Sequence, residues 1–93
     1  MTDKLAQRMA AVLKAIAHPD RLRIIEILKN REKCVSDIVK QLGRSQSVTS
    51  QHLNLMMNNG VLARIRGGMR VYYRIANKDV LKILRCLYRH CRQ

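Results

Sequence analysis

Apolar residues in the first third of the chain recur every three or four positions, which is the spacing of one face of an α-helix. A first helix is predicted over residues 3–17, and its apolar stripe consists of Leu5, Met9, Val12, Leu13 and Ile16. Pro19 ends this helix and suits the first turn of a second one, because the N–H that proline lacks would be unpaired there. The second helix is expected to continue to about Asn30.

Two short helices follow with a tight connection between them. The first is predicted over residues 35–42, and Gly43 provides its C-terminal stop. Ser45 is a good N-cap for the next, over residues 46–59. Two helices joined by about three residues match a helix-turn-helix.

The apolar period then changes from helical to alternating. Residues 69–75 alternate strictly, residues 61–66 form a plausible preceding strand, and Gly67-Gly68 between them favours a hairpin. Helical spacing returns over residues 78–92, with Asn77 as the expected cap. The predicted fold is mainly α with a small β-hairpin: a winged helix-turn-helix, extended by a helix at each end, in one domain over residues 1–93.

Composition narrows the class of protein. The chain has 93 residues, of which 47% are hydrophobic, and this content excludes a disordered basic tail. The longest apolar stretch, Met9–Leu13, is far shorter than the roughly 20 residues of a membrane span. Charged residues interrupt the N-terminus, so we expect no signal peptide and no membrane partner. Three cysteines, an odd number, fit reduced thiols in the cytoplasm better than a disulfide framework.

The charge is strongly positive and unevenly made. Nineteen Lys and Arg against six Asp and Glu give a formal net charge of +13, which makes nucleic acid the first partner to consider. Between Asp37 and Asp79 there is no acid at all. The basic residues are not denser there than elsewhere, so the local charge arises from missing acids. This interval contains the predicted helix-turn-helix and hairpin.

The helix over residues 46–59 has one apolar and one polar face. Hydroxyls and amides of the polar face suit adenine edges and phosphates in the major groove of double-stranded DNA, and the N-terminal end of such a helix usually meets the bases. The candidate DNA-binding residues of this helix are Gln46, Ser47, Val48, Gln51, His52 and Asn54.

The hairpin carries arginines suited to phosphates or to a narrow minor groove. From the alternation we expect all of them to point away from the apolar face, namely Arg64, Arg66, Arg70 and Arg74. A solvated edge ribbon kept soluble by charge is the plainer alternative.

The first and last helices carry more apolar surface than a small helix-turn-helix needs. Pairing them with a second copy across a two-fold axis would bury these stripes and present two recognition helices to a two-fold DNA site. A homodimer is therefore expected.

Three segments resemble the ArsR/SmtB family of winged-helix repressors. Residues 13–24, which read LKAIAHPDRLRI, resemble the opening signature of the family. Residues 45–53, SQSVTSQHL, resemble its recognition helix, and residues 68–75, GMRVYYRI, its wing. The resemblance covers nearly the whole chain and implies a dimeric repressor that releases DNA when an inducer binds.

The inducer motifs of that family are incomplete in this sequence. Arsenic and cadmium sensors often carry Cys-Val-Cys where this chain has Cys34-Val35-Ser36. Persulfide and redox sensors have a cysteine in the second helix, where this chain has Glu26, and another near the position of Cys91. The positions that match the zinc set are Asn77, Asp79, His90 and Gln93, which is a poor set of ligands.

Thiol chemistry considered without the family leaves several inducers open. Cys86 and Cys91 are five residues apart and diverge by about 140° on a helix, whereas Cys86 and His90 share a face. Sensing candidates are therefore Cys34, Cys86, Cys91 and His90, with a soft metal or metalloid, or a persulfide or redox species, as inducer. The alternative is that the cysteines are small apolar residues without a sensing role.

Two other functions remain open at this point. One is a basic RNA-binding or ribosome-associated module without sensing, in which Tyr72 and Tyr73 would stack on bases. The other is a protein-interaction winged helix whose charge only aids solubility. No nucleophile–base arrangement is visible, so an enzyme is not expected, and a cofactor is not assigned. His18 and His52 are expected to be structural or close to DNA, not metal ligands.

Overall fold

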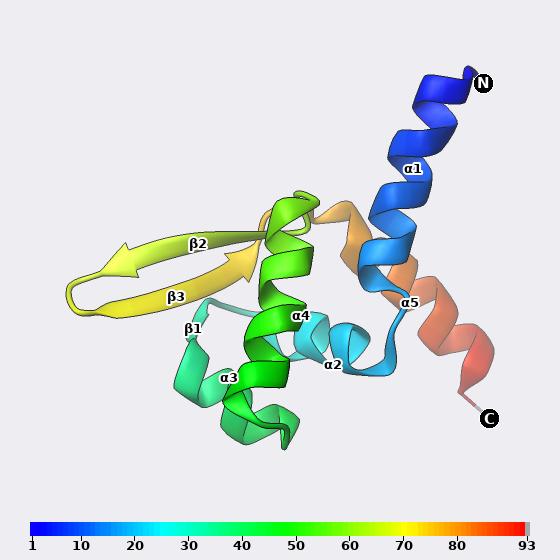
Figure 1. Ribbon diagram of the computed structural model, residues 1–93. Helices are drawn as coiled ribbons and strands as arrows, with labels where there is room; N and C mark the ends of the chain where they lie inside the picture. Colours follow the sequence, from blue (N-terminus) through cyan, green and yellow to red (C-terminus); the bar gives the residue numbers. More distant parts are fainter. Residues whose placement is uncertain (93) are drawn as a thin grey trace.

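The computed structural model of the chain describes residues 1–92 and contains five helices and three strands in that range (Figure 1). The elements in chain order are α1 (Asp3–Ile16), α2 (Pro19–Leu28), β1 (Lys33–Cys34), α3 (Val35–Leu42), α4 (Gln46–Asn58), β2 (Leu62–Gly67), β3 (Arg70–Ile75) and α5 (Asp79–Cys91). The strands form one antiparallel sheet in the order β1-β3-β2. The predicted winged helix-turn-helix with an additional helix at each end is confirmed.

Strand β1 is the one element that the sequence did not predict. It is only two residues long, so it contains no alternation that a pattern could reveal. Its two residues pair with the wing strand β3, with Lys33 opposite Tyr73 and Cys34 opposite Tyr72. The pairing ties the segment before α3 to the hairpin, and the wing is therefore anchored at its base on both sides of β3.

Local capping explains where the helices begin. The Thr2 hydroxyl accepts from the backbone N–H of Leu5, and the Ser45 hydroxyl accepts from that of Val48, both at 3.1 Å. Pro19 is the first residue of α2, as expected from its missing N–H. At α5 the helix begins at Asp79, and the Asn77 side chain accepts from its backbone N–H at 3.1 Å.

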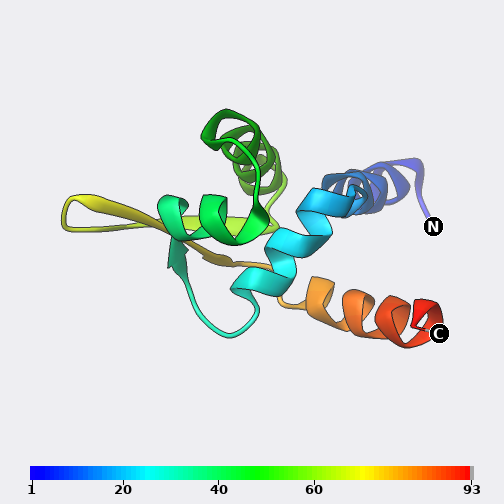
Figure 2. The same ribbon diagram turned by 90° about the horizontal axis from the view of Figure 1, so that it is seen from below.

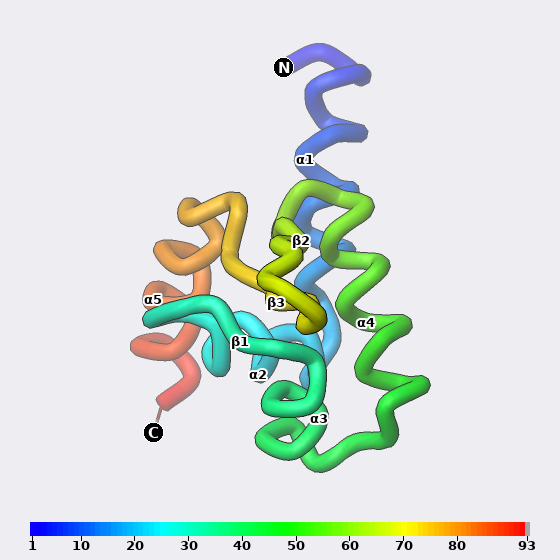
Figure 3. The backbone as a smooth tube through the Cα atoms, turned by 90° about the vertical axis from the view of Figure 1, so that its left-hand side faces the viewer, coloured from blue at the N-terminus to red at the C-terminus, as the bar shows by residue number. Residues whose placement is uncertain are grey.

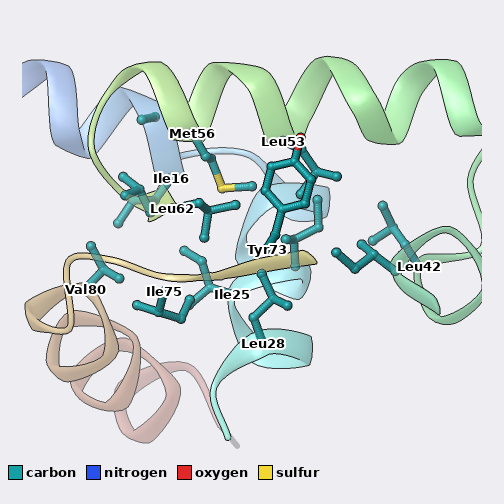
Figure 4. Close-up of a cluster of buried hydrophobic side chains, with 14 residues drawn as sticks. Ile16, Ile25, Leu28, Leu42, Leu53, Met56, Leu62, Tyr73, Ile75 and Val80 are labelled. Atoms are coloured by element: carbon teal, nitrogen blue, oxygen red, sulfur yellow. The ribbon is translucent and has the colours of Figure 1, made fainter. Parts of the chain in front are cut away.

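One cluster of buried apolar side chains lies between α4 and the sheet and extends to α2. Figure 4 shows the Tyr73 side chain extending from β3 towards α4, at the level of Leu53 and Met56, with Ile25 and Leu28 of α2 below. Aliphatic residues and Tyr73 build this core, because the chain has no Phe or Trp. The buried face of α4 fixes which of its side chains remain free.

The first and last helices project away from this core. Figure 2 shows α1 and α5 extending from the body at the end opposite the hairpin. Among the residues of α1, only Ala15 and Ile16, at its C-terminal end, are buried, and Leu5, Met9 and Leu13 are each about half exposed. Leu87 and Tyr88 of α5 are likewise exposed. Within residues 1–92, none of the helices combines the length and apolarity that crossing a bilayer requires.

A group of polar side chains joins α2 to the helix-turn-helix, and we call His18, Asp20, Arg21, Arg44 and His52 the polar junction. The Asp20 carboxylate is 8% exposed and accepts from Nε of Arg44 at 3.1 Å. Nε2 of His52 lies 3.5 Å from the same carboxylate oxygen. The connection between α3 and α4 and the middle of α4 are therefore both held to the first turn of α2.

The two other members of the polar junction complete its hydrogen bonds. His18 caps α2, because its Nδ1 accepts from the backbone N–H of Asp20 at 3.0 Å. Its ring lies 4.5 Å from that of His52, centroid to centroid. Nη1 of Arg21 is 3.2 Å from Nδ1 of His52, and because arginine can only donate, this nitrogen is the acceptor. His52 is therefore neutral, with its proton on Nε2 facing Asp20.

The substitution Thr49→Val should raise the free energy of unfolding by about 1 kcal/mol. The Thr49 side chain is fully buried, and its hydroxyl has no hydrogen-bond partner in the described part of the chain. Valine replaces this hydroxyl by a methyl group of similar size. Urea unfolding measures the change, and Thr49→Ser is the control, since it keeps the hydroxyl, loses a methyl and should destabilise. A valine variant less stable than the wild type would contradict the prediction.

Stability should also fall as the pH is lowered below about 6.5. Burial and the charges of His18 and Arg21 lower the pKa of His52, against the opposing effect of Asp20. The unfolded chain, with its ordinary histidine pKa, therefore binds more protons than the folded chain just below pH 6.5, and acid favours unfolding. Urea unfolding at a series of pH values measures this. His52→Asn, which keeps an acceptor near Nδ1 without titrating, should flatten the profile, and an equally steep profile would assign it to other groups.

Candidate nucleic-acid interface

The connection between α3 and α4 is the tight turn that a helix-turn-helix requires. Gly43 ends α3 with a φ of 74°, a left-handed conformation that other residues adopt only at a cost. Two residues later, Ser45 caps α4. Arg44, between them, is half exposed and is held by Asp20. The start of α4 is thus fixed by the backbone of the turn and by the polar junction.

Helix α4 presents a polar face to solvent and an apolar face to the core. Thr49, Leu53 and Met56 are completely buried. The exposed candidates from the sequence lie on the first nine residues of the helix, and they are Gln46, Ser47, Val48, Gln51 and Asn54. Within residues 1–92 no salt bridge involves their side chains, and their amides and hydroxyl can meet the edges of bases.

His52 departs from the expectation of a DNA contact. Its side chain is only 12% exposed, and both ring nitrogens face members of the polar junction. The sequence pattern did not reveal this, because His52 lies between the two faces of the helical wheel. We therefore correct its assignment: His52 contacts Asp20 and Arg21 on the inner side of α4 and is not exposed for a contact with bases.

The hairpin extends well beyond the core. All residues from Arg64 to Arg70 are exposed, and Figure 3, which looks at the hairpin from its tip, shows α4 and α5 on opposite sides of it. Gly68 at the tip has a φ of 64°. Tyr72 lies across the other glycine, since a Cβ on Gly67 would come within 3.2 Å of its ring. The ring supports a tip that has no core beneath it.

The arginines do not share one face of the hairpin, contrary to the expectation from alternation. In the register, Leu62 is opposite Ile75, and both are buried on the core side. Arg64, opposite Tyr73, and Arg66, opposite Val71, follow Leu62 on that same side. Arg70 and Arg74 lie on the other side. The expectation failed because the buried Leu62, and not the more exposed Ile65, sets the phase of β2.

This arrangement places positive charge on both faces of the wing. Arg64 and Arg66 remain exposed although they are on the core side, because the hairpin has left the body by that point. Tyr73 is only 5% exposed, and Tyr72 is partly covered, so neither offers a free ring for stacking on bases. The wing suits backbone or groove contacts more than single-stranded stacking.

The three cysteines are free thiols in different environments. Cys34 is 4% exposed, and its sulfur lies 3.2 Å from the hydroxyl of Ser36, which occupies the second thiol position of the Cys-Val-Cys pattern. Cys86 and Cys91 are exposed on α5, and so is His90. The burial of Cys34 matches a structural residue, whereas the α5 thiols are open to reagents.

A cavity of about 490 Å³ separates α2 from α5. Glu26 and Lys29 of α2 face Leu84, Arg85 and Tyr88 of α5 across it. Glu26 lies at the position where redox sensors of the ArsR/SmtB family, which the chain resembles, have a cysteine. A smaller cavity next to Tyr88 is lined by Cys91 and Arg92.

Among the positions that match the zinc set, those that the structure describes do not converge within one chain. Asp79 begins α5 and pairs with Lys82 at 3.4 Å, while His90 is at the other end of the same helix, about 16 Å away at 1.5 Å per residue. Asn77 is engaged in capping, and Gln93 lies outside the described residues.

His18, Asp20 and His52 do bring ligand atoms within 4.8 Å of one another. A metal on Nε2 of His52 would leave the ring proton on Nδ1, where it would face the guanidinium of Arg21, which is itself a donor. Arg44 already occupies the carboxylate of Asp20. The polar junction therefore fits hydrogen bonding and not a metal ion.

Asp20, Arg21 and Arg44 are the residues near this interface that sequence reasoning missed. Asp20 follows a proline at the start of a helix, where an acid is ordinarily explained by the helix dipole. Its near-complete burial has no signature in the sequence, because it depends on α4 folding back over α2. Burial alone would raise the pKa of Asp20. The hydrogen bond and charge of Arg44, together with the charges of His18 and His52, outweigh this effect and lower the pKa of Asp20 below its ordinary value.

Comparison with known proteins agrees with this geometry. The family model described as "Bacterial regulatory protein, arsR family" matches residues 18–63, from the start of α2 into β2. The transcriptional repressor PagR of Bacillus anthracis is 42% identical over 79 residues, which are 84% of this chain and 79% of the relative.

Solved structures are similar over nearly the whole chain. The crystal structure of NolR from Sinorhizobium fredii has a TM-score of 0.88 at 30% identity and covers 98% of this chain and 94% of its own. A homodimeric winged helix-turn-helix DNA-binding domain from Mycobacterium bovis has a TM-score of 0.83 at 31% identity, with 94% and 83% covered. PagR is a transcriptional repressor, and the Mycobacterium bovis domain is described as a possible ArsR-family transcriptional regulator. The chain belongs to the arsR family of bacterial regulatory proteins.

Proposed function

We propose that this chain is a sequence-specific transcriptional repressor that binds double-stranded DNA as a homodimer in the cytoplasm. The observation that carries the proposal is the exposed polar face of α4 beside an arginine-bearing hairpin, on a chain of formal net charge +13. PagR, a transcriptional repressor, supports the same function. The buried cluster runs from Ala15 to Val80, which supports treating residues 1–93 as one DNA-binding unit.

Helix α4 is proposed to read sequence in the major groove. Gln51 and Asn54 have amides that can pair with adenine through two hydrogen bonds, while Gln46, Ser47 and Val48 lie at the N-terminal end that usually meets the bases first. The buried half of α4 and the polar junction hold this face rigidly, which limits the entropy lost on binding.

The wing is proposed to contact the DNA backbone or a minor groove. Arg70 and Arg74 on one face, and Arg64 and Arg66 on the other, can reach phosphates on both sides of the hairpin. These contacts position the protein and carry little sequence information themselves.

A second copy of the chain is proposed to cover the exposed apolar residues of α1 and α5. One exposed apolar stripe, on α1, consists of Leu5, Met9 and Leu13. The exposed apolar residues of α5 are Leu87 and Tyr88. The homodimeric relative supports this assembly. A two-fold dimer presents two α4 helices to half-sites about one turn of DNA apart.

The inducer is proposed to act through thiols of α5. Cys86 and Cys91 are exposed, with His90 beside them, and Cys91 lines a cavity next to Tyr88. A soft metal or metalloid ion, or a persulfide or oxidant, is the chemistry these groups receive. Because α5 also belongs to the proposed dimer surface, an adduct there would change how the two copies sit on DNA.

Gln51→Ala should relax base preference at one position, with a loss of roughly 1–3 kcal/mol of discrimination. Arg70→Ala should weaken binding to all sequences and reduce, by about one, the slope of the logarithm of the binding constant against the logarithm of the salt concentration. The measurement uses a duplex selected by the wild type from a random pool, its single-base variants, a scrambled duplex and RNA, at several salt concentrations. Gln41→Ala and Arg31→Ala, exposed residues outside the interface, are matched controls.

Three outcomes of this experiment are informative against the proposal. Equal affinity for the selected and scrambled duplexes would exclude sequence-specific repression. Stronger binding to RNA would favour the basic RNA-binding module. An unchanged base preference in Gln51→Ala would show that another face of α4 meets the bases.

For the inducer, Cys91→Ser or Cys86→Ser should raise the inducer concentration that is needed to release DNA at least tenfold. Cys34→Ser should leave this concentration unchanged. The expected difference follows from their exposure, since Cys34 is 4% exposed and the two others are exposed. DNA release is measured with arsenite, cadmium, zinc, persulfide and peroxide. If none of the three variants changes release by any of these reagents, thiol sensing is excluded.

A further inference from the structure

The side chain of Arg21 spans the space between the end of α1 and the middle of α4. Its Nε donates to the carbonyl of Ala15 at 2.8 Å and its Nη2 to that of Lys14 at 3.1 Å, both in the last turn of α1. Its Nη1 donates to Nδ1 of His52 at 3.2 Å. One guanidinium thus connects two helices that are far apart in the sequence.

The connection is made where α1 is anchored. Only Ala15 and Ile16 of this helix are buried, with Val12 partly buried against the core, and the rest of α1 extends away from the body (Figure 2). A partner that packs along α1 therefore acts on a helix held mainly at one end. Movement of α1 would first displace the carbonyls of Lys14 and Ala15, to which Arg21 donates.

The other end of the connection determines how α4 is placed. His52 is fixed from both sides, by Arg21 at Nδ1 and by Asp20 at Nε2. Gln51, the neighbouring residue, is exposed on the proposed reading face. A shift of His52 would move the side chains that meet the bases.

We propose that Arg21 is a positioning residue that transmits the placement of α1 in the homodimer to the recognition helix α4 through His52. This inference rests on the proposed function. Through this connection, occupying the dimer surface sets the relative placement of the two reading helices, and affinity for a two-fold site depends on it more than affinity for a single half-site.

The connection exists only while His52 is neutral. Protonation puts a hydrogen on Nδ1 and turns an acceptor into a donor that faces the Arg21 guanidinium. The charged and titratable groups around His52 are Asp20 and His18 at the start of α2, Arg21 of α2, and Arg44 held on Asp20. Of these groups, only Asp20 favours the protonated ring. Once acid protonates His52, two donors face each other, and the bond to Arg21 that links α4 to α1 is expected to break.

The test compares two conservative substitutions on the same helix. Arg21→Lys keeps the charge but cannot reach two carbonyls and an imidazole together. Arg23→Lys is the matched control, because Arg23 also donates to backbone carbonyls, those of Leu42 and Gln41 in α3, and within residues 1–92 it makes no hydrogen bond to α1 or α4. Both variants are checked for folding by thermal unfolding and for dimer formation by sedimentation.

Affinities are measured for a duplex selected by the wild type and for a shortened duplex with a single half-site. Arg21→Lys should weaken binding to the two-fold duplex roughly tenfold, within the 5- to 150-fold range of typical couplings between sites, and binding to the half-site much less. Arg23→Lys should leave the ratio of the two affinities unchanged. Equal losses on both duplexes, or the same ratio in both variants, would overturn the proposal.

A second measurement uses the pH and compares the wild type with His52→Asn. Because the pKa of His52 is lowered, wild-type affinity for the two-fold duplex should fall relative to the half-site only as the pH is lowered below about 6.5. His52→Asn, which retains an acceptor near Nδ1, should abolish this dependence. A pH profile that is identical in His52→Asn would overturn the inference.

Failure of the proposed function is distinguishable from failure of the coupling. If the wild type prefers no duplex, the function fails, and the coupling is judged by amide hydrogen exchange of α4 in dilute and concentrated protein. Dimer formation should protect α4 in the wild type and in Arg23→Lys but not in Arg21→Lys. Equal protection in all three proteins would contradict the coupling without DNA.

Discussion

The carboxylate of Asp20 is the constraint on which the placement of the reading helix depends. It is nearly buried, and a buried charge is tolerated only where hydrogen bonds and opposite charge compensate for the lost water. Arg44, in the turn, supplies that compensation through a charged hydrogen bond, and Nε2 of His52, in the middle of α4, lies 3.5 Å from the same carboxylate oxygen. A purely apolar contact could hold α4 against α2 as strongly, but it would permit sliding and rotation. Directional bonds to one carboxylate permit far less of either.

This local order contrasts with the incomplete burial at the ends of the chain. The core cluster buries the apolar faces of α2, α3 and α4 and the base of the sheet. The helices α1 and α5, in contrast, leave apolar residues about half exposed. Such surface is costly in water and is the usual mark of an interface. Function is therefore divided along the molecule, with the hairpin at one end, the pairing helices at the other, and α4 between them (Figure 1). Arg21 lies where the pairing and reading parts meet, and this is why a single side chain can influence both.

The sequence predicted the elements well because each obeys its own local period. The apolar spacing found all five helices and the hairpin, and Ser45 and Gly43 marked the turn correctly. It also identified the exposed face of α4, since burial of Thr49, Leu53 and Met56 follows from helical geometry. It did not find β1, which is too short to have a period, or the sides taken by Arg64 and Arg66, which depend on the pairing register. The polar junction was inaccessible for a related reason, because its members are brought together only by the packing of α2 against α4.

The long stretch without acids acquires a different meaning once Asp20 is placed. Counting along the sequence, Arg44 belongs to an interval free of negative charge, yet in space it pairs with Asp20 from outside that interval. The arginine in the turn is therefore partly neutralised, whereas the four arginines of the wing are exposed and take part in no salt bridge within residues 1–92. Because the compensating carboxylate is almost fully buried, it faces the interior and repels few phosphates. The chain thus uses an acid to fix its reading helix and keeps that acid off the surface that DNA would meet, which the absence of acids in the sequence does not reveal by itself.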